Sequence, residues 1–317
     1  MPEFGFALSS ELHSPNELVE YAGRAEELGF DYLTISDHFH PWISAQGESP
    51  FVWSTLGGVA REIDDIPIAT GVTAPIIRIH PAIIAQAAAT AATMLPGGFS
   101  LGVGTGENLN EHVVGEGWPE HEVRLEMLEE AVEVIRKLWT GESVSHHGAH
   151  YDVENARVYT LPDETPDIPV SAYGPKTAES AAEIGDGLVS VGPQEAVVET
   201  YRDAGGEGPR YGQMTVSYAE TEDEAVEAAY ERWPNTALTG DLNTELATPK
   251  HFEQACEMIE PEDIREGSTP TNPDPDTHVE NVQAFADAGY EHVTLHQIAP
   301  DVEGLLEFYA EDVIPSF

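Results

Sequence analysis

Short apolar runs alternate with longer amphipathic segments along most of the chain. The apolar runs have the length of buried strands, and the segments between them carry the three- and four-residue spacing of a helix with one buried face. We expect strands at residues 3–8, 31–36, 66–72, 99–104, 168–173, 187–192, 213–219 and 291–298. We expect helices at residues 14–30, 51–63, 81–95, 121–139, 176–185, 194–205, 222–233, 277–289 and 302–313. Continuously apolar strands that are each followed by a helix predict an α/β fold with a covered parallel sheet, and eight such units favour a closed TIM (β/α)8 barrel over an open sheet.

Two stretches interrupt this alternation and predict insertions into the barrel. Residues 141–166 contain SVSHHGAHYDVENARVY, which predicts a hairpin. Residues 234–276 are rich in Thr, Pro, Asn and Asp, and only one helix, near residues 251–259, is expected there. The chain has 317 residues, against about 250 for a typical barrel. We therefore expect one barrel domain over residues 1–317 with these two insertion segments.

The chain carries a large excess of negative charge. There are 58 Asp and Glu against 13 Lys and Arg, a formal net charge of -45, and the acidic residues are spread along the sequence. Such an excess predicts a solvated acidic surface that repels itself in dilute salt and is screened at molar salt, where the Debye length is about 3 Å. This composition is typical of a salt-in halophile, with an ordinary acidic protein as the alternative. It disfavours nucleic acid as a partner, because no basic stripe could neutralise phosphates.

Cysteine usage and hydropathy bear on the compartment. Cys256 is the one cysteine, so no internal disulfide can form, and we expect a buried thiol. No apolar run reaches membrane-spanning length, and the first residues lead into a predicted strand without a basic and apolar leader. We therefore expect a cytoplasmic protein with no membrane partner.

Asp37, His38 and Trp42 follow the second predicted strand, on the face of a barrel where catalytic groups collect. An imidazole in that position can take or give a proton near neutral pH. An indole adds a large flat wall with one N–H donor. The alternative is a helix-capping Asp beside a structural His.

A glycine-rich segment, GVGTGENLNE, follows the fourth predicted strand. It is a weak match to a dinucleotide fingerprint, because it lies in the fourth unit and no acidic residue closes a following strand at the required distance. Gly104 and Gly106 instead let the backbone approach a flat ligand closely, with Glu107 and Asn110 at the edge of that ligand. A surface position for Glu107 is the alternative.

Two other strand ends are followed by candidate binding residues. Gly71-Val72 ends the third strand, and its plain interpretation is a tight exit. The stretch from Gly174 to Thr177 opens a helix, whose free N–H groups make an anion site. Lys176 in this turn is a scarce cation in an acidic chain and suggests a phosphate, with an exposed lysine as the alternative.

The remaining chemistry-bearing residues give no catalytic or metal pattern. His146, His147 and His150 cluster in the predicted hairpin without a ligand set that would complete a metal site, so no metal is expected. No G-x-S-x-G segment is present, and Cys256 has no spaced catalytic partner.

Four segments together resemble the luciferase-like flavin and deazaflavin superfamily: SDHFHPW, TGVTAPIIRIHPAIIAQAAAT, LGVGTGENLNE and AYGPKTAESAAEIGDGLVS. Within it, the chain is most similar to the coenzyme F420-dependent glucose-6-phosphate dehydrogenase group. The resemblance runs from Phe4 to about Gly192, thins through the irregular region and returns in the last helix–strand–helix. It implies a TIM-like barrel with insertions, a deazaflavin cofactor (F420, with FMN as the alternative) and hydride transfer at the deazaflavin C5.

The resemblance also implies roles for individual residues. His38 matches the base that takes the hydroxyl proton of the substrate, Trp42 an aromatic residue lining the reaction centre, and Glu107 an acid beside the cofactor ring. Gly71-Val72 matches a non-proline cis peptide behind the deazaflavin. The residues that match cofactor contacts are Asp37, Gly71, Val72, Thr105, Gly106, Asn110, Gly174, Pro175, Lys176 and Thr177, the last four as a phosphate-binding turn.

One departure from that group concerns the substrate. Its sugar-phosphate enzymes hold the phosphate with two lysines and an arginine, and the matching positions here fall near Pro193, Asn243 and Gly267. None of these is basic, although Lys250 and Arg265 are close enough in sequence to be shifted substitutes. The loss of one charge-assisted contact costs about 1.5–3 kcal/mol. We therefore expect an unphosphorylated substrate, either a free sugar or a small secondary alcohol.

Three other functions stay open at this stage. One is an FMN-dependent luciferase-like monooxygenase or reductase, one a methylene-tetrahydropterin reductase type of enzyme, and one a non-catalytic flavin-binding protein. The last has no need of His38, Trp42 and Glu107 together. By analogy with the group we expect a homodimer that acts on a small molecule.

Overall fold

A computed structural model describes residues 1–317 and contains one sheet of eight strands. All neighbouring strands pair in parallel, in the order β4-β3-β2-β1-β10-β9-β8-β7. The strands are β1 (Glu3–Leu8), β2 (Tyr32–Ile35), β3 (Ile68–Thr70), β4 (Phe99–Ser100), β7 (Pro169–Ser171), β8 (Gly187–Val191), β9 (Arg210–Val216) and β10 (His292–Gln297).

The sheet closes between its two ends, just beyond β4. The backbone N–H of Val103 donates to the carbonyl of Pro169 over 2.9 Å, and the carbonyl of Val103 accepts from Ser171 over 2.8 Å. Val103 thereby bridges to Val170 of β7, so the first and last strands of the sheet meet. The predicted (β/α)8 barrel is confirmed.

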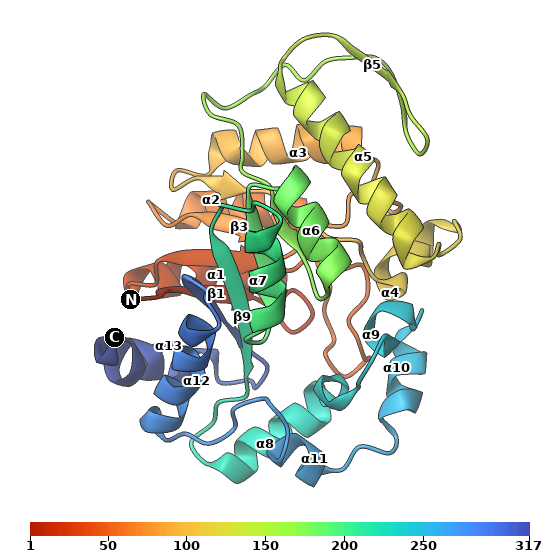
Figure 1. Cartoon of the computed structure of the whole chain (residues 1–317). Helices are drawn as coiled ribbons and strands as arrows, with labels where there is room; N and C mark the ends of the chain where they lie inside the picture. Colours follow the sequence, from red (N-terminus) through yellow and green to blue (C-terminus); the bar gives the residue numbers. More distant parts are fainter.

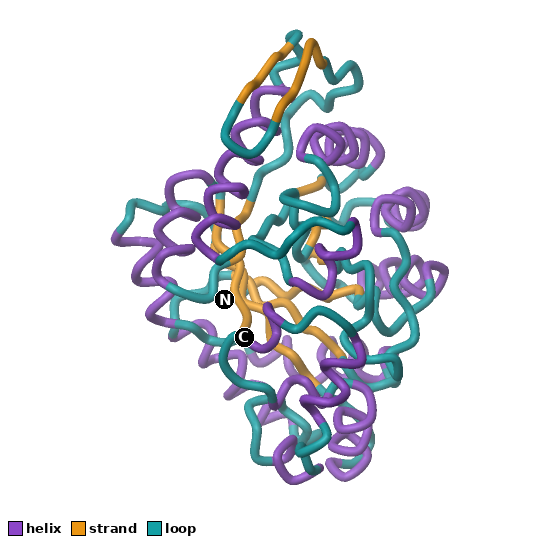
Figure 2. Tube along the Cα trace, turned by 90° about the vertical axis from the view of Figure 1, so that its right-hand side faces the viewer, coloured by secondary structure: helices purple, strands orange, loops and turns teal.

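Helices surround the strands, which lie at the centre of the molecule (Figure 2). The helices that follow the strands are α1 (Pro15–Glu27), α2 (Val52–Glu62), α3 (Pro81–Met94), α5 (His121–Trp139), α6 (Pro175–Ile184), α7 (Glu195–Asp203), α8 (Glu222–Arg232), α12 (Pro275–Asp287) and α13 (Val302–Phe308). The sequence explains their beginnings; for example, Ser14 and Glu17 form a reciprocal capping box at α1. Apolar faces of these helices and the strand side chains share one large core.

Two excursions leave this pattern where the sequence predicted insertions (Figure 1). The first is an antiparallel hairpin of β5 (Val144–His147) and β6 (Asp152–Ala156), which projects beyond the barrel at the top of the figure. The second contains a 3-10 turn η2 (Pro234–Ala237), α9 (Leu242–Glu245), α10 (Pro249–Cys256) and α11 (Pro261–Arg265). It is more helical than the single helix expected, because proline at the first position starts α10 and α11.

Some boundaries differ from the expectations. The predicted strand 99–104 is regular only over β4, because its glycines leave the ladder and the chain continues as single bridges. A short helix, α4 (Asn108–Glu111), with a 3-10 turn over His112–Val114, replaces the expected loop. The last predicted helix ends as α13 and continues as a π-helical turn, η3 (Tyr309–Val313).

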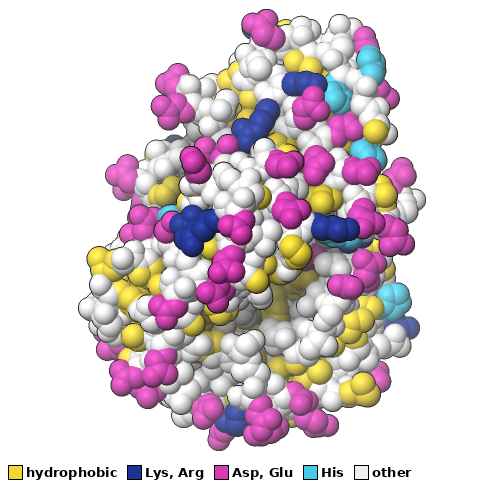
Figure 3. Space-filling model, viewed as in Figure 1, with side chains coloured by type: hydrophobic (Ala, Val, Ile, Leu, Met, Phe, Trp, Pro, Cys, Tyr) yellow, Lys and Arg dark blue, Asp and Glu magenta, His cyan; other side chains and the backbone are white.

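The charge of the surface and the state of the single cysteine agree with what the composition predicts. Acidic side chains are scattered over the whole face in Figure 3, and Lys and Arg are sparser on it. Cys256 is a free, buried thiol, as expected, and burial raises its pKa to about 11. None of the helices combines the length and the apolar character needed to cross a membrane.

Candidate active site

A cavity of about 1520 Å³ opens where the strands end and their loops begin. Figure 3 shows the surface hollowed near the centre of the face. The volume exceeds the roughly 300–1000 Å³ of a typical small-ligand pocket, so the cavity has room for a large ligand and a small one together. Its wall includes all of the site residues expected from the sequence: Asp37, His38, Trp42, Gly71, Val72, Thr105, Gly106, Glu107, Asn110, Gly174, Pro175, Lys176 and Thr177.

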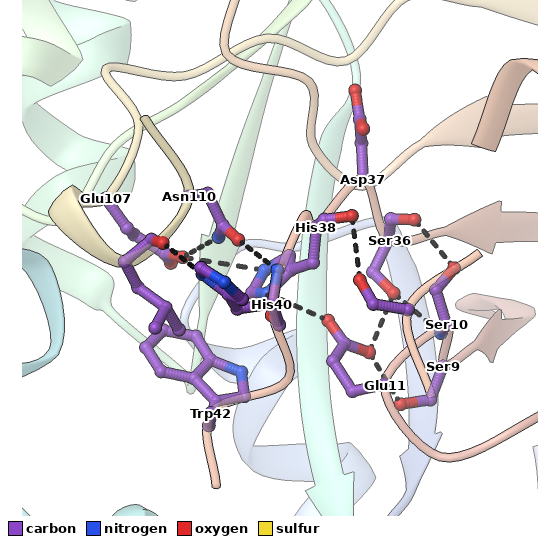
Figure 4. A network of polar contacts seen from close by, with 12 residues as sticks. Ser9, Ser10, Glu11, Ser36, Asp37, His38, His40, Trp42, Glu107 and Asn110 are labelled. Atoms are coloured by element: carbon purple, nitrogen blue, oxygen red, sulfur yellow. Dashed lines mark hydrogen bonds and ion pairs between the residues drawn. The ribbon is translucent and has the colours of Figure 1, made fainter. Parts of the chain in front are cut away.

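His38 lies between two carboxylates in this cavity (Figure 4). Its Nδ1 is 3.3 Å from Oε1 of Glu11, and its Nε2 is 3.5 Å from Oε2 of Glu107. The imidazole is 13% exposed, and the Glu107 side chain is 26% exposed toward the cavity. The end of β2 supplies His38, the loop after β1 supplies Glu11, and the segment before α4 supplies Glu107.

The acceptors around His38 fix its tautomer. Nδ1 faces a carboxylate oxygen of Glu11 and, at 3.3 Å, the carbonyl oxygen of His40. Both groups only accept hydrogen bonds, so Nδ1 carries the proton. In the neutral imidazole the lone pair is then on Nε2, the ring nitrogen that faces Glu107 and the cavity. His38 is therefore arranged to accept a proton at Nε2.

Glu11 is held in its ionised form by donors. The hydroxyls of Ser9 and Ser36 donate to its Oε2 over 2.9 and 2.8 Å. Burial by itself raises the pKa of this carboxyl, but the nearby imidazoles of His38 and His296 and these hydrogen bonds outweigh it and lower the pKa. An ionised Glu11 holds the His38 ring in place and stabilises the positive charge that the ring gains with a proton.

Glu107 has the opposite shift. Burial raises its pKa to about 7, although His38 and a hydrogen bond from Asn110 act in the other direction. That hydrogen bond joins Nδ2 of Asn110 to Oε2 of Glu107 over 3.0 Å. Asn110 also accepts from the backbone N–H groups of Phe39 and His40, so it ties the loop after β2 to Glu107. Near neutral pH, Glu107 is able to donate or accept a proton.

His296 of β10 stands behind Glu11. Its Nε2 is 3.3 Å from the Ser9 hydroxyl, which donates its own proton to Glu11. Nε2 must therefore carry a proton, and Nδ1 is buried without a partner. Burial lowers the pKa of His296 to about 4, so the ring is neutral near pH 7.

Trp42 forms a wall beside the imidazole. Its ring centroid lies 5.2 Å from that of His38 and 5.1 Å from that of Phe252 on α10. The side chain packs in a second apolar cluster with Trp233 and Ile298, apart from the barrel core. The second insertion thus holds Trp42 against the cavity.

The Asp37 side chain points away from the His38 imidazole (Figure 4). Its Oδ2 accepts from the Thr73 hydroxyl over 2.9 Å, and its Oδ1 accepts from Nη2 of Arg78 over 2.8 Å. Glu111 in turn accepts from the backbone N–H of Arg78 over 2.7 Å. This buried network joins the loops after β2, β3 and β4, and it leaves the Asp37 carboxylate already hydrogen bonded.

Backbone forms another part of the wall. The Gly71-Val72 peptide bond is cis, as the resemblance implied. A Cβ on Gly104 would lie 3.0 Å from Cγ2 of Val72, so a side chain there would crowd this wall. Gly106 has a φ of 71°, which favours glycine. The wall is therefore open to a flat group that approaches the backbone closely.

The turn before α6 lies at a different part of the rim. Gly174 precedes the helix, and Thr177 is buried with its hydroxyl 3.3 Å from Nε2 of His121. Lys176 is exposed and forms an ion pair with Glu122 of α5. The free N–H groups of the first turn suit an anion, while the lysine already has a carboxylate partner.

Sequence reasoning missed Glu11, Ser9 and His296. Glu11 follows β1 in the segment ALSSEL, and His296 lies near the end of β10. Both positions satisfy the rule that identified His38, because they lie at carboxyl ends of barrel strands. A systematic search of all strand ends for acids and histidines would have found them.

The fold and the cavity define a (β/α)8-barrel protein with a proton-accepting imidazole, a high-pKa carboxyl and a flat backbone wall at its carboxyl-terminal face. The sequence profile of the luciferase-like monooxygenase family matches residues 2–292. The chain belongs to this family.

Curated relatives and a solved structure resemble the chain over nearly its full length. The chain is 33% identical to an F420-dependent glucose-6-phosphate dehydrogenase of Microbacterium testaceum, over 98% of this chain and 96% of the relative. It is 36% identical to an enzyme of the same name from Segniliparus rotundus, over 99% and 97%. The structure of an F420-dependent secondary alcohol dehydrogenase in complex with an F420-acetone adduct matches with a TM-score of 0.90 and 30% identity, over 99% of this chain and 98% of that one.

Proposed function

We propose that this protein is a coenzyme F420-dependent oxidoreductase that transfers a hydride between an unphosphorylated alcohol or sugar carbon and C5 of the deazaflavin. His38 is the general base. The observation that carries the proposal is the His38 ring itself, with Nδ1–H held by Glu11 and the Nε2 lone pair open to the cavity. The F420-dependent relatives at 33% and 36% identity support the choice of cofactor.

The residues present fit a deazaflavin. The flat backbone wall at Gly71-Val72 and Gly104 accepts a planar ring, and a side chain on Gly104 would obstruct it. The turn from Gly174 to Thr177 would hold a phosphate of the cofactor at the start of α6. Glu107 would lie at the edge of the ring, with Thr105, Gly106 and Asn110 as further contacts.

The protein would supply proton transfer and orientation. When bound, the deazaflavin supplies a hydride acceptor at C5. The alcohol oxygen would give its proton to Nε2 of His38 as the carbon is oxidised, and Glu11 would stabilise the resulting imidazolium. Glu107 carries a proton up to about pH 7 and can donate it into the cavity. Trp42 shields the imidazole on one side.

The charges of the cavity wall favour an unphosphorylated substrate. The wall contains eight carboxylates but three cations, Arg124, Lys176 and Arg265, and each cation already contacts a carboxylate. Arg265, for instance, is 2.7 Å from Oδ1 of Asp223. Lys250 is not part of the wall. Away from the start of α6, where a phosphate of the cofactor would bind, a substrate phosphate would therefore meet net negative charge and no free cation.

The positions that matched the family's phosphate ligands support the same proposal. Pro193, Asn243, Gly267 and Ser268 all line the cavity, and none of them is charged. The positions that match the phosphate ligands thus face the cavity, and none of them supplies a cation. An FMN-dependent monooxygenase or reductase remains the rival, and separate titrations with F420 and FMN distinguish the two.

Substitution of His38→Ala tests the base. We expect turnover of F420 with an alcohol substrate to fall by roughly 10²–10⁴-fold, because the proton acceptor is lost. The dissociation constant for F420, measured by its fluorescence in molar KCl, should change by no more than about twofold. His147→Ala, on the exposed hairpin, is the matched control and should leave both quantities unchanged.

Two results would contradict the proposal. A collapse of F420 binding in His38→Ala would make His38 a cofactor ligand rather than a base. Full turnover in that variant would remove His38 from the mechanism.

We also propose that the protein forms a homodimer through α2 and α3. α3 has no charged side chain in a chain with a net charge of -45, and Ile83 and Met94 are 56% and 45% exposed. The two helices form a groove in which the indole Nε1 of Trp53 is buried without a partner. Two such acidic molecules can approach only where carboxylates are absent, which favours a second copy as the occupant.

Ala87→Glu tests this interface, because Ala87 lines the groove. Light scattering in molar KCl should give a dimer for the wild type and a monomer for the variant. Ala196→Glu, on the exposed side of α7, is the control and should stay dimeric. A monomeric wild type would refute the interface. The halophilic and cytoplasmic character expected from the sequence stays a prediction.

A further inference from the structure

One part of the cavity wall has polar side chains that the protein leaves without partners. Asn235 in η2 is 3% exposed; its Oδ1 is buried without a hydrogen bond, and its amide nitrogen makes none either. Thr269 and Thr271, in the segment after α11, line the same cavity at 9% and 5% exposure, and their hydroxyls make no hydrogen bond within the protein. Buried polar groups in folded proteins normally have partners, so Oδ1 of Asn235 points to a ligand, and the hydroxyls of Thr269 and Thr271 are further free polar groups on the same wall.

Asn235 lies toward the end of the cavity that holds the base. Asn235 follows Trp233 by two residues, and the Trp233 ring packs edge-on against His296 at 4.8 Å between centroids. His296 contacts Ser9, and Ser9 donates to Glu11, which holds His38. Contacts therefore link Trp233, two residues before Asn235, to the proton acceptor.

The same end of the cavity offers flat apolar surfaces. Trp42 and Trp233 are 9% and 6% exposed, both line the cavity, and they belong to one apolar cluster. Indole faces pack well against C–H groups, while amides and hydroxyls both donate and accept hydrogen bonds. Rings that carry hydroxyls around their edge and C–H groups on their faces need this combination.

The charges at this end disfavour an anionic substrate group. Glu11 is ionised, and Arg265 is occupied by Asp223 and Glu222. A small secondary alcohol has only one hydroxyl, and that group must face His38. Its alkyl groups would leave Asn235, Thr269 and Thr271 unpaired, which a site built for it would avoid.

We propose that the substrate is a neutral, polyhydroxylated sugar, a free aldose, and that Asn235 with Thr269 and Thr271 recognises its hydroxyls. This rests on the proposed function. With the deazaflavin bound as hydride acceptor, the aldose carbon would give up a hydride, its hydroxyl would give its proton to Nε2 of His38, and a carbon–oxygen double bond would form. When the oxidised carbon is the ring carbon that bears the hemiacetal hydroxyl, the product is a lactone.

The test compares three ligands on the F420-loaded protein in molar KCl: glucose, glucose 6-phosphate and 2-propanol. Saturation-transfer NMR reports binding, and loss of the F420 absorbance reports oxidation. We expect saturable binding and oxidation of glucose, with the other two ligands much poorer. Asn235→Leu should raise the KM for glucose by roughly tenfold or more and weaken its NMR signal, with kcat much less affected.

Controls and contrary outcomes separate this inference from the proposed function. Asn16→Leu, at an exposed position of α1, should leave the glucose KM unchanged, and Thr271→Val gives a second test that keeps the shape of the side chain. Preference for 2-propanol or glucose 6-phosphate, or an unchanged glucose KM in both Asn235→Leu and Thr271→Val, would overturn the sugar assignment and leave the F420 assignment standing. Failure to bind F420 would overturn the proposed function itself.

Discussion

Two carboxylates flank the His38 imidazole, and the two sides of the ring differ in what surrounds them (Figure 4). On the Nδ1 side, Glu11 accepts from the hydroxyls of Ser9 and Ser36 and has a lowered pKa. On the Nε2 side, Glu107 accepts from one amide, and burial raises its pKa to about 7. The same residue type is thus kept ionised on one side and able to hold a proton on the other.

The comparison shows that burial alone does not set the charge of a carboxyl. Burial raises the pKa of both groups, and the number of donors and positive neighbours decides the final direction. The resulting asymmetry orients the imidazole. A fixed acceptor behind Nδ1 directs the lone pair of Nε2 toward the cavity, where Glu107 can also exchange a proton.

Removing the charge behind the ring should have the largest effect. Glu11→Gln keeps an oxygen that can accept from Nδ1 but removes the counter-charge of the imidazolium. We expect turnover of F420 with its alcohol substrate to fall roughly 100-fold, with F420 affinity unchanged, because the base loses its electrostatic support. Steady-state kinetics and F420 fluorescence measure the two quantities.

Glu11→Asp is the matched variant, because it keeps the charge but shortens the side chain. It should recover part of the activity lost in Glu11→Gln. Equal loss in the two variants would mean that packing rather than charge matters at this position.

Changing the other side of the ring should alter the pH dependence. The wild type should lose turnover in alcohol oxidation as the pH rises through about 7, because Glu107 loses the proton that it can donate. Glu107→Gln should lack this decline and be slower by roughly tenfold at low pH. The measurement is a pH profile of turnover at saturating substrate.

Stability gives an independent measurement on Glu107. Its folded pKa of about 7 lies above its ordinary value of 4.5, so the folded protein binds the extra proton between these values. The unfolding free energy of the wild type should therefore fall, relative to Glu107→Gln, as the pH rises through this window, by on the order of 3 kcal/mol. Glu199→Gln, an exposed carboxylate on α7, should show no such difference. A pH-independent difference for Glu107→Gln would contradict the assigned shift.

The smallest effect is expected from one donor on the Glu11 side. Ser9→Ala removes one of the hydroxyls that keep the pKa of Glu11 low. Turnover should fall about threefold, and the loss of activity on acidification should move to a higher pH, because Glu11 takes up its proton earlier. Ser54→Ala, at an exposed position of α2, is the control. If the acidic side of the pH profile of turnover does not move in Ser9→Ala, the Ser9 hydroxyl has no influence on the base.

The sequence predicted the helices and strands well where the signals were local. The residues 121–139 expected as one helix are α5 to the residue, and the hairpin of β5 and β6 lies within its expected insertion. The predicted strand 99–104 is longer than the observed β4. An apolar, glycine-rich segment has the pattern of a strand, but its pairing with neighbouring strands depends on the tertiary structure. The second insertion packs its helices against Trp42, a contact that no local pattern encodes.

The order of strands and helices, the acidic surface and the position of His38 just after a strand follow from the chain alone, because periodicity, composition and strand order are local or additive properties. The groups that surround the imidazole are brought together by the folding of the barrel. Ser9, Glu11 and His296 lie at opposite ends of the chain and meet because β1 and β10 are neighbours in the closed barrel. Their distances and burial set the opposite pKa shifts of Glu11 and Glu107, and a pKa depends on surroundings in space rather than on neighbours in sequence.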